Sequence, residues 1–276
     1  MQKTDQAKQM VEQGLAQLAE ALEQGQSQAL RDYLNTMARF HRYSIGNVML
    51  ILLQCPQATH VAGYHTWKTL GRQVKMGERG ILILAPVVRA RTRSEGASEI
   101  PPGDDEQPSS QVIGFRAAHV FDVSQTEGQA LPELATAAGS PGDYTERLRG
   151  LVRQLAIGLE YSEELGTADG VSQGGLIKIR AGLTPAQEFA VLVHELAHEL
   201  LHKSAATRAQ TDRSLRELEA EAVSYVVSEA VGLDTQAAAT DYIQLYRGDA
   251  QTLATSLEAI RGVATGILSA LVRAER

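Results

Sequence analysis

The first 54 residues show the hydrophobic periodicity of amphipathic helices. Apolar side chains recur at intervals of three or four residues in two stretches, which contain Met10, Val11, Leu15, Leu18 and Leu22, and Leu30, Tyr33, Leu34, Met37 and Phe40. This spacing places each set on one face of a helix. A third helix is expected over residues 44–54, because Pro56 cannot continue it.

Two longer apolar segments predict strands. Residues 81–88 follow a turn-like segment with two glycines, and residues 112–123 resume a strand-like pattern. Between them, residues 92–110 are rich in Ser, Pro, Gly and acidic side chains, a composition typical of a mobile surface loop. We therefore expect residues 1–127 to form an α+β domain.

The rest of the chain predicts a second domain. Residues 128–142 consist largely of Ala, Gly, Pro and Ser and are expected to form a linker. Beyond it the pattern predicts helices over 144–156 and 214–231, a helix beginning at Thr184, short strands over 159–161 and 176–180, and two or three terminal helices. Thr184, Pro185 and Gln187 suit the N-cap, the first helical position and a capping box. The predicted fold class is α+β with two domains, and residues 143–276 form a mainly helical domain with a small sheet.

The composition excludes several classes of protein. Hydrophobic residues make up 43% of the 276 residues and charged residues 21%, which excludes a wholly disordered chain. The only cysteine, Cys55, excludes an intramolecular disulfide and a multi-cysteine metal site. The unbroken apolar stretches are far shorter than the roughly 20 residues that span a bilayer, and the first residues lack the apolar core of a signal peptide. These features predict a cytoplasmic protein with no membrane partner.

The helix predicted to begin at Thr184 carries the main chemical motif of the chain. It contains His194-Glu195-Leu-Ala-His198, and two histidines four residues apart leave the same face of a helix and can bind one metal ion. Glu195 lies beside them, positioned to polarise a metal-bound water. This is the HExxH arrangement of zinc peptidases. Zinc is the default cofactor, although manganese, cobalt and nickel also suit such donors.

A zinc site of this kind needs a third protein ligand. His202 is eight residues beyond His194, about 12 Å along the axis of a continuous helix, which is too far to share the ion. The next predicted helix offers Glu217 and Glu221, which share a face, whereas Glu219 points elsewhere. We predict Glu217 as the ligand and Glu221 as the carboxylate that accepts the second ring N–H of a ligating histidine.

This arrangement resembles the gluzincin metallopeptidases, including the ImmA/IrrE-like group, in which HExxH is followed on a later helix by Glu-x-x-Ala-(Asp/Glu/Asn). Here the second motif reads Glu217-Leu-Glu-Ala220-Glu221, and the resemblance covers residues 144–272. It implies a zincin-like hydrolase with Glu195 as general base, and an edge strand such as residues 177–180 that holds an extended peptide. Tyr225, which continues the face of Glu217 and Glu221, is the candidate for stabilising the oxyanion.

The charge is unevenly spread along the chain. The net charge is −7, yet residues 28–93 contain ten basic and only two acidic side chains. Basic residues can follow a phosphate backbone, and aromatic faces can stack on bases. The candidates for binding single-stranded DNA in this stretch are Arg42, Tyr43, Ser44, Asn47, Trp67, Lys68, Arg72, Lys75 and Arg79.

The order of motifs in the first 126 residues resembles the N-terminal domain of ArdC-type antirestriction proteins. The motifs are Tyr43-Ser-x-x-Asn47, Gln54-Cys-Pro56, Trp67-Lys-x-Leu-Gly71-Arg-x-Val-Lys75-x-Gly77-Glu-x-Gly80 and Phe121-Asp-Val-x-Gln125-Thr126. That family joins this domain to a zinc-metallopeptidase domain. The resemblance implies binding of single-stranded DNA, an association with conjugative elements of bacteria, and protection of incoming DNA from restriction.

Three functions follow from these motifs. The first is an antirestriction-type protein that binds single-stranded DNA and cleaves a protein met there, for example a restriction enzyme. The second is a non-catalytic protein that masks DNA and whose metal site is structural. The third is an ImmA/IrrE-like regulatory protease that cleaves a repressor.

Overall fold

The computed structural model describes residues 2–90, 110–130, 140–202, 212–233 and 250–273. The predicted loop 92–110 lies outside the described residues except for its last residue. The middle of the predicted linker also lies outside them, as do residues 234–249, part of the segment in which two or three terminal helices are expected.

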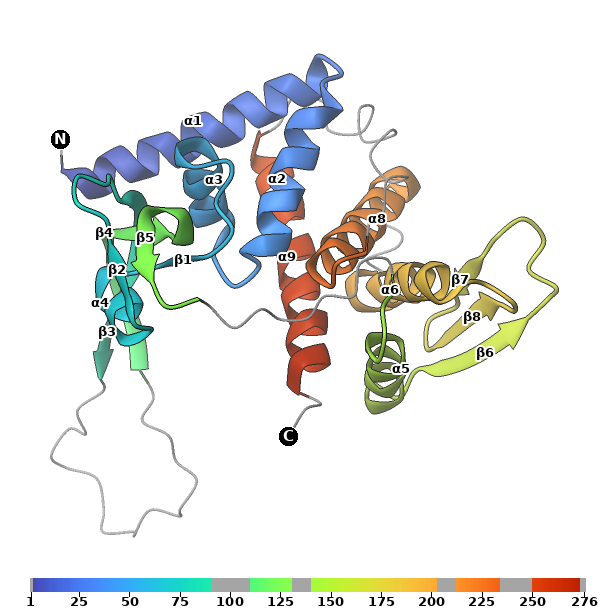
Figure 1. Cartoon of the computed structure of the whole chain (residues 1–276). Helices are drawn as coiled ribbons and strands as arrows, with labels where there is room; N and C mark the ends of the chain where they lie inside the picture. Colours follow the sequence, from blue (N-terminus) through green and yellow to red (C-terminus); the bar gives the residue numbers. More distant parts are fainter. Residues whose placement is uncertain (1, 91–109, 131–139, 203–211, 234–249, 274–276) are drawn as a thin grey trace, which may run out of the picture.

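The chain has the mixed α+β fold that its sequence predicts (Figure 1). The elements of the first part are α1 (Lys3–Glu23), α2 (Ser27–Arg39), α3 (Ile45–Gln54), β1 (Val61–Ala62), α4 (Tyr64–Thr69), β2 (Arg72–Val74), β3 (Ile81–Ala90), β4 (Ser110–Asp122), a 3-10 turn (Val123–Gln125) and β5 (Thr126–Gly128). Those of the second part are α5 (Tyr144–Gln154), β6 (Gly158–Ser162), β7 (Gly170–Ser172), β8 (Leu176–Arg180), α6 (Pro185–Leu201), α8 (Arg213–Ala230) and α9 (Ala250–Arg273).

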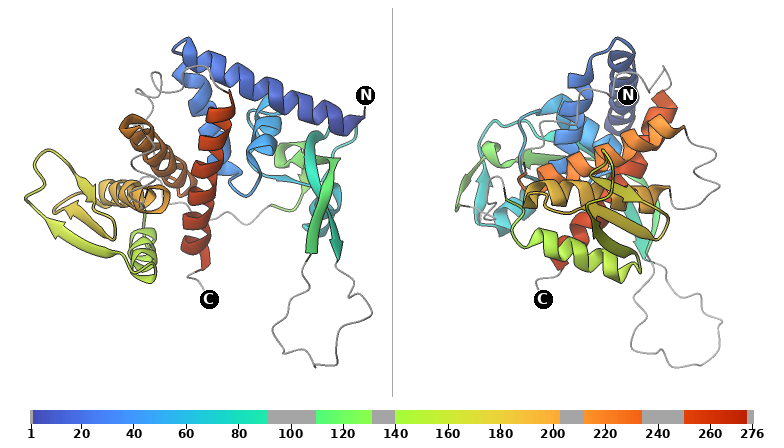
Figure 2. Two further views of the ribbon diagram at one scale, coloured as in Figure 1. Left: turned by 180° about the vertical axis from the view of Figure 1, so that it is seen from behind. Right: turned by 90° about the vertical axis from the view of Figure 1, so that its right-hand side faces the viewer.

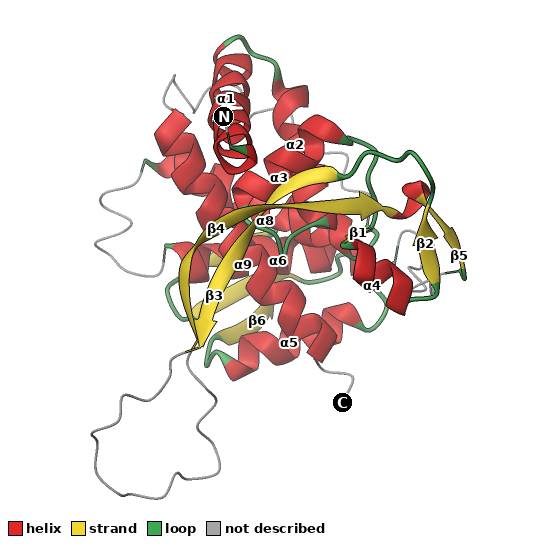
Figure 3. Ribbon diagram, turned by 90° about the vertical axis from the view of Figure 1, so that its left-hand side faces the viewer, coloured by secondary structure: helices red, strands yellow, loops and turns green. Residues whose placement is uncertain are grey.

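Strands β3 and β4 form a long, twisted antiparallel ribbon (Figure 3). Helix α3 covers one edge of it through two amide side chains. Asn47 accepts from the backbone N–H of Leu84 and donates to its carbonyl, at 2.8 and 2.9 Å, and Gln54 makes the same pair of bonds with Leu82. Asn47 therefore satisfies backbone groups of an edge strand, and its predicted role in binding DNA is wrong.

The predicted role of Trp67 is also wrong. Its side chain is 2% exposed, and the indole N–H donates to the carbonyl of Phe121 at 2.8 Å. A buried indole normally finds such a partner. Trp67 thus anchors the short helix α4 to strand β4 and presents no face on which a base could stack.

The sheet of the second part has the strand order β6-β8-β7. Strand β8 pairs in parallel with β6 and antiparallel with β7, so both of its edges are already hydrogen-bonded. The expectation that residues 177–180 bind an extended peptide is therefore wrong. The edge next to α6 belongs instead to β7.

Helix α9 joins the two parts of the chain. Figure 2 shows it between the N-terminal helices and the pair α6 and α8, and one continuous cluster of buried apolar side chains extends from α1 and α2 through α9 to α6. Among the described residues α9 is the one helix long and apolar enough to cross a membrane. Its apolar residues Leu253, Leu257, Ile260, Ala264, Ile267 and Leu271 are buried, which is the arrangement of a core helix.

Candidate metal centre

Local signals fix the start of α6, which carries the HExxH motif. Thr184 accepts from the backbone N–H of Gln187, the side chain of Gln187 bonds back to Thr184, and Pro185 occupies the first turn. This confirms the predicted capping box. The apolar residues Phe189, Leu192, Val193 and Leu196 are fully buried, so the opposite face carries His194 and His198 toward α8.

Small residues allow α8 to pack closely against α6. Ala220 is fully buried, and the hydroxyl of Ser224 on the same helix donates to the carbonyl of Ala190 at 2.9 Å. This packing brings Glu217 and Glu221 opposite the two histidines. Asp212 caps the first turn of α8 by accepting from the backbone N–H of Ser214.

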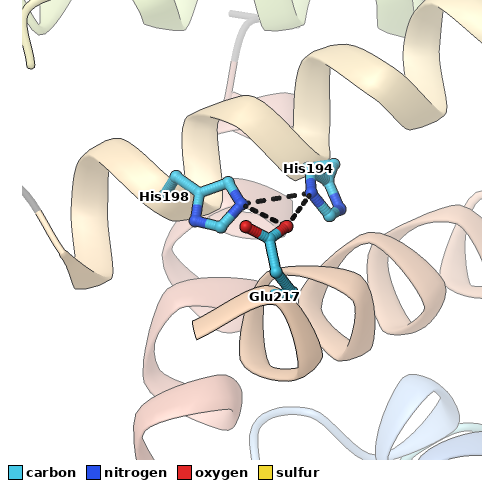
Figure 4. Close-up of side chains that lie close together, drawn as sticks. All are labelled: His194, His198 and Glu217. Atoms are coloured by element: carbon cyan, nitrogen blue, oxygen red, sulfur yellow. Dashed lines mark hydrogen bonds and ion pairs between the residues drawn. The ribbon is translucent and has the colours of Figure 1, made fainter. Parts of the chain in front are cut away.

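Three donor atoms converge in the space between α6 and α8 (Figure 4). The Nε2 atoms of His194 and His198 are 3.1 Å apart, and Glu217 Oε2 lies 3.6 Å from the first and 3.3 Å from the second. A tetrahedral zinc site separates its nitrogen and oxygen ligands by about 3.3 Å. The donor set of two imidazoles and one carboxylate therefore fits a divalent metal ion in both chemistry and spacing.

Glu221 fixes the orientation of His194. Its Oε2 atom lies 3.1 Å from Nδ1 of His194, on the side of the ring away from Glu217. A carboxylate on Nδ1 favours the tautomer that leaves the lone pair on Nε2. Glu221 thus occupies the position predicted for a residue that orients a ligand.

The side chains of the cluster shift the pKa values of His194 and Glu217 in opposite directions. Burial opposes the charged form of His194, but Glu217 and Glu221 outweigh it and raise the pKa of His194 to about 9. Hydrogen bonds from His194 and His198 lower the pKa of Glu217 well below its ordinary value. Without a metal, the neighbouring acidic side chains therefore favour the protonated form of His194.

The side chain of Glu195, the residue after His194, lies against strand β7. Its side chain is 7% exposed, and burial raises the pKa of its carboxyl above the ordinary value. A Cβ atom added to Gly170 would lie 2.7 Å from Cγ of Glu195, so only glycine at this position leaves room for the carboxylate. Glu195 and β7 line the same cleft of about 780 Å³ as His194, His198 and Glu217.

Two buried acidic residues near the centre were not predicted from the sequence. Glu199, which is 1% exposed, accepts from the hydroxyl of Ser172 at 2.5 Å and from the backbone N–H groups of Gly174 and Gly175, each at 2.7 Å. It therefore fixes the turn between β7 and β8. The adjacent glycines were the only local signal for such an anchor.

The second acidic residue is Glu219, which connects three helices behind the metal centre. It contacts Nε2 of His202 at 3.3 Å and accepts from the hydroxyl of Ser256 on α9 at 2.6 Å. His202 is the C-cap residue of α6, as its position at the predicted helix end suggested. Burial lowers the pKa of His202 to about 4, so the ring is neutral at pH 7.

The structure does not place Tyr225 at the metal centre. Its hydroxyl donates to Oδ1 of Asn35 on α2 at 2.6 Å. Its side chain lines a different cavity, between α2, α8 and α9. Tyr225 therefore bridges the two parts of the chain, and its expected role in stabilising an oxyanion is wrong.

Some of the remaining candidates for DNA binding are exposed, and others pack or form hydrogen bonds within the fold. Arg42, Lys68, Lys75 and Arg79 are exposed, whereas Tyr43 is partly buried and packs edge-on against Phe40. Ser44 is the N-cap of α3, and Arg72 donates to Thr126 and to the carbonyl of Gln129. Lys75 donates to the carbonyl of Ser124 and forms no ion pair with any residue that the structure describes.

Comparisons with known proteins match both parts of the chain. Residues 4–121 match the family model of the N-terminal domain of anti-restriction factor ArdC. A Bacillus anthracis protein described as uncharacterized is 27% identical over 256 residues, which cover 79% of this chain. The chain spans only 43% of the length of that relative.

Two crystal structures of the antirestriction ArdC protein from the R388 plasmid have a similar fold. The metal-free structure is 20% identical with a TM-score of 0.50, and the match covers 85% of this chain and 87% of that one. The Mn(II)-bound structure is 19% identical with a TM-score of 0.55, and the match covers 95% of this chain and 98% of that one. Residues 4–121 are therefore similar to the N-terminal domain of anti-restriction factor ArdC, and the chain as a whole has the fold of an ArdC-type antirestriction protein.

Proposed function

We propose that this protein protects incoming DNA from restriction by binding its single strands and by cleaving a protein encountered there. The observation that carries the proposal is the convergence of His194, His198 and Glu217 within 4.8 Å. The buried carboxyl of Glu195 lies beside them in the same cleft. A metal that served structure alone would need no such carboxyl next to it.

A divalent metal is the proposed cofactor. The R388 ArdC protein has been crystallised with Mn(II), and two imidazoles with a carboxylate accept zinc, manganese, cobalt or nickel. Zinc remains our proposal for this chain, because His2Glu donors with one open position are typical of zinc peptidases. When bound, the metal supplies Lewis acidity that polarises a carbonyl and acidifies water.

Each side chain of the cleft would then have its own role in peptide hydrolysis. His194 and His198 present their Nε2 atoms, and Glu221 holds the His194 ring in the required tautomer. Glu195 takes the proton of the attacking water and passes it to the departing amine, a role that its raised pKa suits. The edge of β7 offers backbone groups to an extended peptide.

We propose that the basic N-terminal part of the chain binds the DNA, while the second part carries the peptidase-like site. Ten basic against two acidic side chains over residues 28–93 favour a phosphate backbone. Incoming DNA meets restriction enzymes in the bacterial cytoplasm, where we expect this protein to act. A restriction enzyme is the proposed protein substrate.

Two variants separate the three candidate functions. Unmethylated plasmid DNA is introduced into a restricting host that expresses the wild type, Glu195→Gln or His194→Ala. A catalytic role predicts that both variants lose protection, although Glu195→Gln still binds metal. Protection that survives in both variants would favour a masking protein with a structural metal. Cleavage of a co-expressed repressor in the absence of DNA would favour the regulatory protease.

A further inference from the structure

A large cavity lies where the two parts of the chain meet, away from the metal centre. Its volume is about 1070 Å³, and residues of α2, α8 and α9 contribute to its lining. We call it the junction cavity. Helix α2 and the turn after it supply one wall, and α8 and α9 supply the other. The volume lies just above the roughly 300–1,000 Å³ typical of ligand sites.

Within the part of the chain that the structure describes, the arginines of the α2 wall form no ion pair with a carboxylate. Arg31 is partly buried and Arg42 is exposed, and among the described residues neither forms a hydrogen bond or an ion pair. Arg39 donates to three backbone carbonyls, those of Asn35, Pro56 and Ala58. The one acidic side chain that lines the cavity is Glu229. The three guanidinium groups therefore favour an anion at the mouth of the cavity.

The opposite wall is apolar and aromatic. Tyr225 and Leu268 are buried, and Val272 is 54% exposed at the end of α9. The Tyr225 hydroxyl is already engaged with Asn35, so the ring contributes its hydrocarbon surface. A nucleotide has the matching chemistry, since its phosphate is anionic and its base is flat and apolar on both faces.

We propose that the junction cavity receives unpaired nucleotides of single-stranded DNA, with the phosphates on Arg31 and Arg42 and a base against the Tyr225 wall. The proposal rests on the proposed binding of single-stranded DNA and gives it a location. A duplex keeps its bases paired and stacked, so only its backbone reaches the arginines. Helix α8 carries both this wall and Glu217, so a bound strand contacts the helix that supplies a predicted metal ligand.

A second, smaller cavity is the alternative location. It measures about 410 Å³ and is lined by Tyr64, Lys68 and Arg72, together with Glu127. Arg72 is already engaged with Thr126 and Gln129. The junction cavity therefore offers more unpaired charge and more apolar surface.

Fluorescence anisotropy of a labelled oligothymidylate with the full chain tests the proposal. Arg42→Glu reverses a charge of the junction cavity, Lys68→Glu does the same in the smaller cavity, and Lys8→Glu is the matched control on the exposed face of α1. Val272→Trp fills the mouth of the junction cavity without changing the charge. We expect Arg42→Glu and Val272→Trp each to weaken binding about tenfold. Lys8→Glu should stay within about twofold of the wild type, and Lys68→Glu should weaken binding less than Arg42→Glu does.

Three further readouts make the result decisive. The double variant Arg31→Ala/Arg42→Ala should lower the salt slope by about 1.4, because each single-strand phosphate contact contributes about 0.7. A duplex of equal length should bind more weakly and should not respond to Val272→Trp. The thermal midpoint of each variant, measured by circular dichroism, should match that of the wild type.

The failures of the two proposals are distinguishable. Binding by the wild type that is unchanged in Arg42→Glu and Val272→Trp would overturn the junction cavity as the site and leave DNA binding intact. A loss confined to Lys68→Glu would move the site to the smaller cavity. No binding by the wild type would overturn the DNA-binding function itself, and this inference with it.

Discussion

The ring of His194 is surrounded by carboxylates, and this determines how protons and metal ions compete for it. Glu217 contacts its Nε2 atom and Glu221 its Nδ1 atom, which raises the pKa of the ring to about 9 although burial acts in the opposite direction. The protonated ring therefore stabilises the metal-free fold fully below about pH 6.5, and this stabilisation is lost as the pH rises through about 9.

Metal binding should therefore release a proton. At pH 7 the ring must lose its proton before Nε2 can bind a cation, so we expect release of about one proton per Zn²⁺ and an affinity that rises up to about pH 9. Calorimetric titration in buffers of different ionisation enthalpy measures this release. Glu221→Gln removes one of the two carboxylates and should shift the pH dependence to lower pH. An affinity independent of pH over this range would contradict the assignment of His194 as a ligand.

Tyr225→Phe tests whether this tyrosine bridges helices or takes part in catalysis. Loss of the hydroxyl removes the hydrogen bond to Asn35 and should lower the free energy of unfolding by about 1 kcal/mol. Metal affinity and any peptidase activity should be unchanged. Urea denaturation measures the loss, and Tyr64→Phe is the control because that side chain is 47% exposed. A fall in activity without a fall in stability would restore Tyr225 as a catalytic candidate.

The sequence predicted part of the site because helical geometry links residues close in sequence. The spacing of four residues brings His194 to His198 and Glu217 to Glu221 on their helices, as the structure has them. The same geometry explains the error at Tyr225, which lies eight residues beyond Glu217, about 80° around the helix and about 12 Å along it. Trp67 could not be placed, because its burial depends on Phe121, which is distant in sequence.

Among the secondary-structure elements, those whose ends are set by local chemistry agree best with prediction. The capping box of α6 and the strand at residues 176–180 were both predicted from their own residues. Strand β7 was missed because three residues show no alternation of apolar and polar positions. The order of strands in the sheet depends on contacts between segments, so periodicity could not reveal that β8 is central.

The turn between β7 and β8 should depend on Glu199. Glu199→Ala leaves the backbone N–H groups of Gly174 and Gly175 without their acceptor, and should lower the free energy of unfolding by about 3 kcal/mol. Hydrogen exchange at residues 170–175 should accelerate, because the turn loses its anchor. Denaturant unfolding and exchange mass spectrometry measure the two effects. Leu200→Ala, at a side chain 41% exposed, is the control and should be nearly neutral.

At the scale of the whole molecule, the two predicted domains share one core. Buried residues of α2, α8 and α9 belong to the same apolar cluster. Hydrogen bonds from Tyr225 to Asn35 and from Thr265 to the carbonyl of His41 cross the junction. Separation of the two parts would therefore expose apolar surface on both, which favours cooperative unfolding of the whole chain.

This coupling predicts that a metal bound to the second part stabilises the first. Trp67, the only tryptophan, is buried between α4 and β4 and reports on the N-terminal part alone. We expect its fluorescence and the far-UV circular dichroism to follow one thermal transition. Zn²⁺ at a hundred times its Kd should stabilise both signals equally, by about 2.7 kcal/mol. His194→Ala should abolish this stabilisation in both signals, because it removes a predicted ligand. A Trp67 transition that does not respond to metal, while the circular dichroism does, would mean that the two parts unfold independently despite their shared core.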